Sequence, residues 1–105
     1  MATSPFENPN SKTETEPITH LYIVRTGVFV NIYLNGISVT GNNAWVEICD
    51  VPQPDVNDVY TFFTVYNWSN NSIRLARIYG GKLYIDVPAN HGTCSYRGCV
   101  CYRAL

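Results

Sequence analysis

The sequence has 105 residues, the length of one domain with a modest core. Its formal net charge is −1, so it has no basic field that would hold a phosphate backbone, and nucleic-acid binding is not expected as its main activity. Charged residues make up 14%, well under the roughly 25% typical of soluble domains, whereas aromatic residues make up 13%. This composition is typical of a β-protein with a neutral, aromatic surface. Such a surface also suits hydroxyl-rich ligands, because rings stack on sugars and amides bond to hydroxyls.

Residues 1–17 differ in composition from the rest of the chain. They contain Pro5, Pro9 and Pro17 among Ser, Thr, Asn and Glu. Low hydrophobicity and frequent proline predict an extended arm, either a frayed terminus or a tether to a larger assembly. The stretch lacks the positive and apolar regions of a signal peptide, and no apolar run reaches the roughly 18 residues of a membrane-spanning helix. We therefore expect a protein that is made in a reducing cytoplasm and does not insert into a membrane.

From Ile18 onward the sequence follows a period of two, which is typical of β-strands. The runs predict strands at residues 18–24, 28–38, 44–52, 59–67, 73–79 and 82–88, with a last strand within 92–105. Turn signals separate these runs, and Asn35-Gly36 indicates either a hairpin turn or a bulge. About seven short strands at this spacing predict an all-β domain over residues 18–105, an antiparallel β-sandwich or jelly-roll-like barrel.

Three of the 4 cysteines lie near the end of the chain, at Cys94, Cys99 and Cys101. In a strand, residues two apart project from one face roughly 7 Å apart, whereas two sulfurs on one zinc ion lie about 3.8 Å apart. The C-x-C spacing therefore disfavours a zinc site and a Cys99–Cys101 disulfide, although Cys49 and His91 stay open as additional partners. We expect free cysteines that behave as small buried apolar residues, with no metal and no cofactor.

The sequence carries no recognisable catalytic motif. His20 and His91 have no nucleophile or carboxylate pair beside them, and the signatures of hydrolases, zinc proteases, P-loops and dinucleotide sites do not occur. A cysteine nucleophile with a distant histidine stays open as an alternative, because such partners need not be neighbours in sequence. We expect a protein without enzymatic activity.

The order of features from residue 45 to the end resembles one known family. WVEIC at 45–49 leads into Val51-Pro52 and an aromatic, β-branched strand, and the hairpin RIYGGKLYI at 77–85 precedes the closing YRGCVCY at 96–102. This order resembles the C-terminal head domains of tail-tip and baseplate receptor-binding proteins from phages of Gram-positive bacteria, lactococcal siphophages included. The match covers roughly residues 20–105 and consists of β-structure landmarks.

The resemblance implies a compact antiparallel barrel or jelly-roll head that assembles as a homotrimer. Such heads attach the virion to host cell-wall saccharides, and the implied location is the tail tip or baseplate of the virion. An N-terminal arm would contact other tail or baseplate proteins. The chain is too short for the family's full shaft, so we expect a head-only fragment or a head-like accessory protein.

Trp68, in the loop YNWSNN, is the first candidate for a saccharide site, because an aromatic ring in a polar loop is poorly explained by a core. Packing at the barrel end or between subunits is the alternative for this side chain, and Trp45 is expected to pack in the core or at a sheet edge. Four neighbours are expected to supply stacking and hydrogen bonds to the ligand: Tyr66, Asn70, Asn71 and Arg74. His91 with Asp86 is expected to line a ligand-binding groove between subunits, with a solvated loop histidine as the alternative.

The last strand has two partly apolar faces, one with Arg97, Cys99, Cys101 and Arg103 and the other with the alternating residues. We expect the core to cover one face and a neighbouring subunit to cover the other. The subunit contact is assigned to Tyr96, Gly98, Val100 and Tyr102. Two alternatives to a receptor-binding head share this fold: a structural fibre, trimerisation or virion-decoration module without a sugar site, and a non-viral carbohydrate-binding module.

Overall fold

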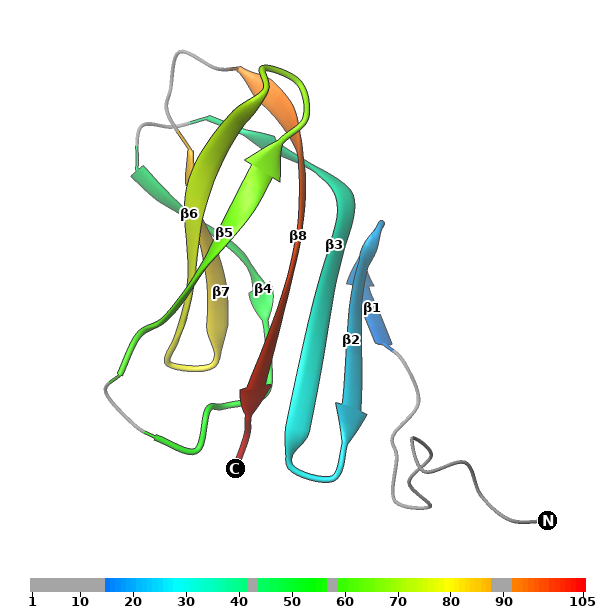
Figure 1. Cartoon of the computed structure of the whole chain (residues 1–105), viewed down its shortest axis with the longest axis vertical. Helices are drawn as coiled ribbons and strands as arrows, with labels where there is room; N and C mark the ends of the chain where they lie inside the picture. Colours follow the sequence, from blue (N-terminus) through cyan, green and yellow to red (C-terminus); the bar gives the residue numbers. More distant parts are fainter. Residues whose placement is uncertain (1–14, 42–43, 57–58, 88–91) are drawn as a thin grey trace, which may run out of the picture.

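The computed structural model describes residues 15–41, 44–56, 59–87 and 92–105. The described ranges form eight strands and contain no helix that could span a membrane. In chain order the strands are β1 (Thr15–Ile18), β2 (Leu21–Thr26), β3 (Phe29–Thr40), β4 (Ala44–Asp50), β5 (Thr61–Asn67), β6 (Ser72–Tyr79), β7 (Lys82–Val87) and β8 (Thr93–Arg103), as labelled in Figure 1.

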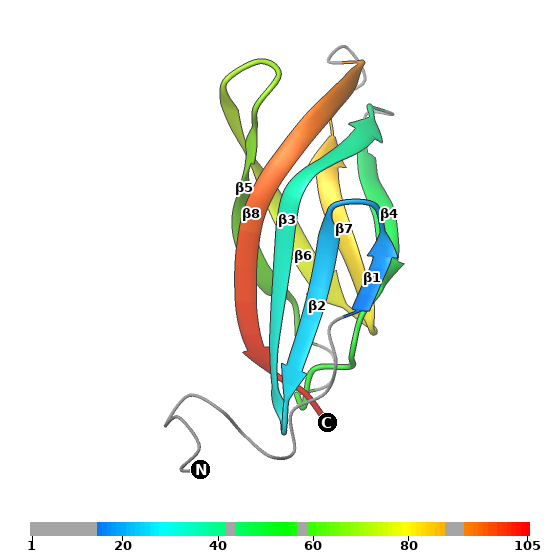
Figure 2. The ribbon, with the colours of Figure 1, turned by 90° about the vertical axis from the view of Figure 1, so that its right-hand side faces the viewer.

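The strands form one antiparallel sheet that nearly closes into a barrel. Its order is β1-β2-β3-β8-β5-β6-β7-β4, so the chain's last strand lies between β3 and β5. The edge strands β1 and β4 lie close to each other, and the sheet curls round to bring them together (Figure 2). The prediction of an all-β antiparallel domain is therefore confirmed.

The core fills the inside of this curled sheet and follows from the alternation of side chains. In β3, for example, Val30, Ile32 and Leu34 are buried, whereas Phe29 and Tyr33 alternate with them, point outward and are about half exposed. The same alternation repeats along β2, β7 and β8. The largest fully buried apolar side chains are Tyr96, Leu21, Ile32, Ile37, Ile78, Leu83, Ile85, Val30, Val65 and Val87.

The bulge alternative at Asn35-Gly36 is confirmed. The register between β3 and β8 shifts between Asn35 and Ile37, and Gly36 has a φ of 92°, a conformation that L side chains rarely adopt. The extra residue places both Leu34 and Ile37 on the core face, although they are three positions apart. A single long strand can therefore bend around the barrel without exposing its apolar side chains.

The structure adds one strand that the period-two pattern did not predict. β1 forms a hairpin with β2, in which Ile18 pairs with Leu21, and the N–H of His20 in the turn donates to Glu16 Oε1 at 2.9 Å. The predicted arm is therefore wrong for residues 15–17, which belong to the sheet. Pro17 fits here because β1 is an edge strand, where a missing N–H costs little. The rest of the predicted arm, residues 1–14, lies outside the described residues.

Candidate functional site

The turn between β5 and β6 is organised from beneath by one buried amide. Asn67 is fully buried, and its Oδ1 accepts hydrogen bonds from the backbone N–H groups of Ser69 and Asn70 at 3.0 and 3.2 Å. Its Nδ2 donates to the hydroxyl of Tyr96 at 3.4 Å. Asn71 closes the turn with a φ of 58°, a left-handed conformation that asparagine tolerates. The turn is therefore fixed to the core by a side chain rather than left to solvent.

Trp68 projects from this turn and is 59% exposed. Its backbone N–H donates to the carbonyl of Ser95 at 2.8 Å, and the N–H of Ser95 donates to Ser69 Oγ at 2.9 Å, so two hydrogen bonds join the turn to β8. The indole meets the ring of Tyr66 edge-on, with centroids 5.8 Å apart. The guanidinium of Arg97 lies 4.8 Å from the indole centroid. The exposed ring is thus held in one orientation by its neighbours.

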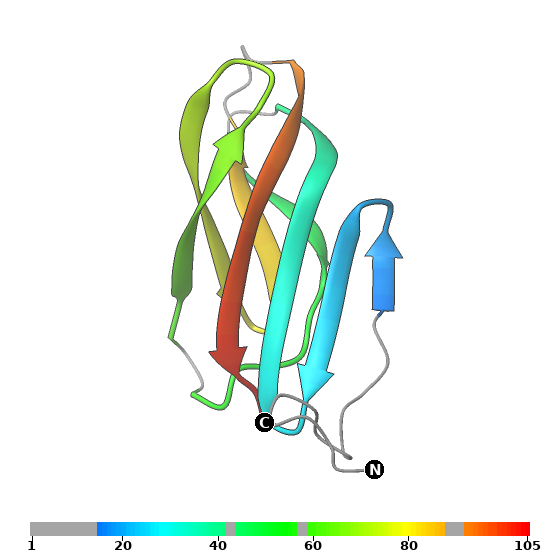
Figure 3. The same cartoon turned by 45° about the vertical axis from the view of Figure 1, so that its right-hand side comes forward.

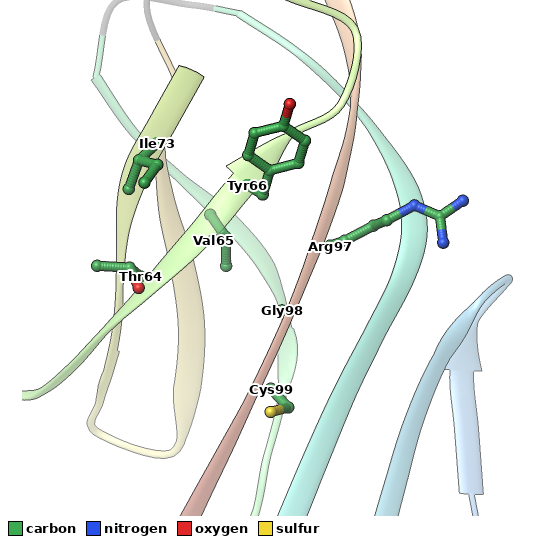
Figure 4. Close-up of a pocket in the computed structure, with 7 residues that line it drawn as sticks. All are labelled: Thr64, Val65, Tyr66, Ile73, Arg97, Gly98 and Cys99. Atoms are coloured by element: carbon green, nitrogen blue, oxygen red, sulfur yellow. The ribbon is translucent and has the colours of Figure 1, made fainter. Parts of the chain in front are cut away.

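A groove of about 360 Å³ lies beside this ring on the outer surface. Figure 4 shows the residues that line it: Thr64, Val65, Tyr66, Ile73, Arg97, Gly98 and Cys99. β5 pairs with β8 at only two positions, Tyr66 with Arg97 and Asn67 with Tyr96, and the two strands diverge beyond them (Figure 3). The groove forms where the strands separate.

Gly98 sets how closely β5 approaches β8. A Cβ atom at this position would lie 3.0 Å from Val65 Cγ1 and 3.2 Å from the Thr64 carbonyl oxygen. Those distances are shorter than ordinary van der Waals contacts, so a side chain here would push the strands apart. The missing Cβ therefore lets β5 approach β8 closely beside the groove.

The groove is lined by both polar and apolar side chains. Arg97 donates from Nη1 to Asn35 Oδ1 at 3.1 Å, and the hydroxyl of Tyr66 donates to Asn71 Oδ1 at 2.5 Å. No carboxylate is among the lining residues, so the guanidinium supplies the charge of the described site. The arrangement can stack a flat apolar surface against the indole and offer neutral hydrogen-bonding groups around it.

The structure brings together four of the residues predicted for the saccharide site: Trp68, Tyr66, Asn70 and Asn71. Arg74 lies elsewhere, because it is one position away from Ile73 and therefore occupies the opposite face of β6. There it forms an ion pair with Asp86, with 2.9 Å between Nη2 and Oδ2, and donates from Nε to the Asp86 carbonyl at 3.1 Å. His91 lies outside the described residues.

The sequence reasoning missed Thr64, Ile73, Arg97 and Cys99 as members of the site. Arg97 and Cys99 were placed on one face of the last strand, but nothing local indicates that β5 is the neighbour of that strand. The pairing joins residues about 30 positions apart, as in Tyr66 with Arg97. A signal was available in Gly98, because an isolated glycine within a strand indicates close approach of another backbone.

Two of the four residues predicted for a subunit contact on β8, Tyr96 and Tyr102, are buried within the chain itself. Tyr96 is fully buried and Tyr102 is 8% exposed, while Val100 is partly buried against the core. The hydroxyl of Tyr102 donates to the Pro52 carbonyl at 2.8 Å, and burial raises its pKa. Gly98 lies under β5, as described above. Tyr96 and Tyr102 are therefore covered by the barrel's own core, whereas Gly98 and Val100 are only partly buried.

The four cysteines differ in burial. Cys94 is buried and Cys49 is half-buried, whereas Cys99 and Cys101 point outward from β8 and are exposed. The prediction of buried cysteines is therefore wrong for Cys99 and Cys101. Among the described residues, no group of three or more His, Cys, Asp or Glu side chains is placed to hold a metal ion.

The four thiols should differ in their rates of alkylation. Burial, with the nearby charges of Asp50 and Glu47, raises the pKa of Cys49 to about 11 from 9.0, so at neutral pH its thiolate fraction is about a hundredfold below that of an ordinary thiol. We expect iodoacetamide to modify Cys99 and Cys101 first and Cys49 and Cys94 slowly, as followed by mass spectrometry of peptides. The same reaction in urea should modify all four alike. Rapid labelling of Cys49 in the folded protein would contradict this ranking.

No family model, curated protein or solved structure matches this chain.

Proposed function

We propose that this domain is a non-catalytic saccharide-binding head, of the kind that attaches a phage virion to the cell wall of its host. The observation that carries the proposal is Trp68, a 59% exposed indole held in a fixed orientation beside a groove. Exposing the apolar surface of an indole to water is unfavourable in free energy. Stacking the indole on the apolar face of a sugar ring removes that surface from water. The resemblance of residues 45–102 to phage receptor-binding heads supports the same function.

The groups around the indole suit a neutral or weakly anionic saccharide. Asn70, Asn71 and Thr64 carry amide and hydroxyl groups that both donate and accept hydrogen bonds, as sugar hydroxyls require. Arg97 would interact with an acidic substituent on the sugar. Because Asn67 and the bonds to Ser95 already order the turn, little conformational entropy is lost when a ligand binds.

The larger assembly follows from the resemblance. We propose a homotrimer of heads on the tail tip or baseplate, in which the N-terminal segment of the chain contacts other tail or baseplate proteins. A structural fibre or decoration module of the same fold is the alternative, and it differs in having no saccharide site. Light scattering of the purified protein measures the oligomeric state, and a monomer would contradict the trimeric assembly without bearing on the Trp68 site.

The test is binding to purified wall polysaccharides from a panel of Gram-positive bacteria, lactococci included, measured by affinity electrophoresis and calorimetry. We expect Trp68→Ala to weaken binding by at least about tenfold, the loss of one good stacking contact, and Trp68→Phe to keep part of it. Phe29→Ala is the matched control, because Phe29 is a comparably exposed ring on β3, at 53%. Equal binding by wild type and Trp68→Ala would contradict the proposed site.

A further inference from the structure

A second surface of the barrel has a different chemistry, on the outer face of β4, β5, β6 and β7. At its centre Arg77 of β6 lies against three aromatic rings. Its guanidinium carbon is 4.3 Å from the centroid of Trp45, 4.9 Å from that of Tyr60 and 5.1 Å from that of Tyr84. These rings come from β4, from the segment just before β5 and from β7, so the arginine is enclosed from several elements.

Arg77 has no acidic partner among the described residues. The ion pairs of the described chain use Arg74, Lys82 and Arg103 as their cations. The Nε atom of Arg77 is buried, and it has no hydrogen-bond acceptor in that part of the molecule. Buried N–H groups in proteins are nearly always paired, and a guanidinium is the group best suited to hold a carboxylate. The guanidinium of Arg77 thus lacks an acidic partner among the described residues, and a carboxylate from another molecule would reach it through the Nη groups.

Next to Arg77 and its three rings, the outer face of the sheet also carries exposed apolar side chains. Phe62 pairs with Arg77 across β5 and β6 and is 52% exposed, and Leu75, two positions before Arg77 on β6, is 40% exposed. Exposed apolar side chains that adjoin one another in this way mark a surface that binds a partner. An unpaired guanidinium beside the exposed apolar side chains of Phe62 and Leu75 favours a protein as the partner, because a protein surface can supply a carboxylate and apolar side chains together.

We propose that this face is a docking surface for a different protein, which places an aspartate or glutamate against Arg77 and apolar side chains against Phe62 and Leu75. A second copy of this chain is a poor occupant. A symmetric contact between two such faces would bring the two Arg77 side chains together. Four of the five acidic side chains in the described residues already form ion pairs within the molecule: Glu47, Asp50, Asp55 and Asp86. The fifth, Glu16, accepts a hydrogen bond from the N–H of His20.

The test uses a displayed library of random peptides, selected on the full chain. We expect enrichment of peptides in which Asp or Glu is flanked by apolar residues. Synthetic copies of these peptides should bind Arg77→Gln at least about tenfold more weakly than wild type, the usual loss when a charge pair is broken. Leu75→Glu should weaken binding similarly by repelling the acidic peptide, while it leaves Arg77 and its rings in place. Arg103→Gln is the matched control, and binding should be unchanged.

Thermal unfolding of each variant distinguishes lost docking from lost folding, and Leu75→Glu keeps the test valid if Arg77→Gln does not fold. The proposal is overturned if the library yields no binder that depends on Arg77, or if selected peptides lack acidic residues. It is also overturned if light scattering shows self-association that Leu75→Glu abolishes, which would make a second copy the occupant. Arg77-dependent binding of polygalacturonate without peptide binding would identify an acidic saccharide instead. Trp68→Ala should leave peptide binding unchanged, so this proposal and the saccharide site fail independently.

Discussion

Replacing Tyr96 by alanine is expected to lower the free energy of unfolding by about 3–5 kcal/mol, as for other large aromatic side chains removed from a core. Tyr96 is fully buried and is the largest fully buried side chain of the described barrel. Its removal leaves a cavity that the surrounding strands fill only in part, because each is held by ladders to its neighbours. Urea unfolding followed by circular dichroism measures the change, and a domain of this size has only about 5–15 kcal/mol to lose.

Tyr96→Phe is the matched control, because it keeps the ring and removes only the hydroxyl that accepts a long hydrogen bond from Asn67. We expect a loss of about 1 kcal/mol or less for this variant. If Tyr96→Ala fails to fold, Tyr96→Leu provides an intermediate cavity. An unfolding free energy unchanged by Tyr96→Ala, combined with a loss of oligomers in light scattering, would restore the subunit contact that the sequence pattern suggested.

The position of β8 shows what alternation can and cannot predict. The pattern correctly indicates that Tyr96, Val100 and Tyr102 share a face, because side chains alternate along any strand. It does not say which face is covered by the core, and in β8 both faces carry apolar or small residues. Arg97 and Arg103 on the other face were the physical signal, because charged side chains are rarely buried without a partner.

The missed strand β1 has a related explanation. Residues 15–18 read TEPI, and proline with two polar neighbours does not have the composition of a strand. β1 exists because β2 has an open edge with which it can pair, and pairing between strands is a property of the fold rather than of the segment. Propensity alone therefore places this segment in an arm.

In the candidate site, too, some residues could be predicted from local sequence, whereas others depend on how the strands pair. Trp68 could be selected from the sequence alone, because an aromatic residue flanked by polar turn residues is not expected to be buried in the core. The neighbouring Arg74 was assigned to the site by its proximity in sequence, but a shift of one residue along a strand reverses the face. Arg97 enters the site only through the pairing of β5 with β8, which no local pattern encodes. The turn residues were thus predictable, and the groove was not.

Replacing Asn67 by alanine is expected to destabilise the fold by about 1–3 kcal/mol and to release Trp68 from its fixed orientation. The amide oxygen satisfies two backbone N–H groups of the turn, and both are partly buried. Without it these donors lose their acceptor, and the removal of a buried partner costs about 1–3 kcal/mol. The Trp68 N–H would still bond to Ser95, so the turn should loosen rather than detach.

The expected signature of Asn67→Ala is a combined change in stability and in the Trp68 environment. Urea unfolding gives the first, and the fluorescence anisotropy of Trp68, measured with Trp45→Phe as background, gives the second. Ser72→Ala is the control, because Ser72 bonds only to Asn70 Oδ1 among the described contacts of its side chain and should change neither quantity much. A saccharide that binds through Trp68 should then bind Asn67→Ala more weakly although every contacting side chain is present, because the ligand would have to order the turn. Unchanged anisotropy with reduced stability would show that Asn67 supports the core alone and that the bonds to β8 are sufficient to orient the indole.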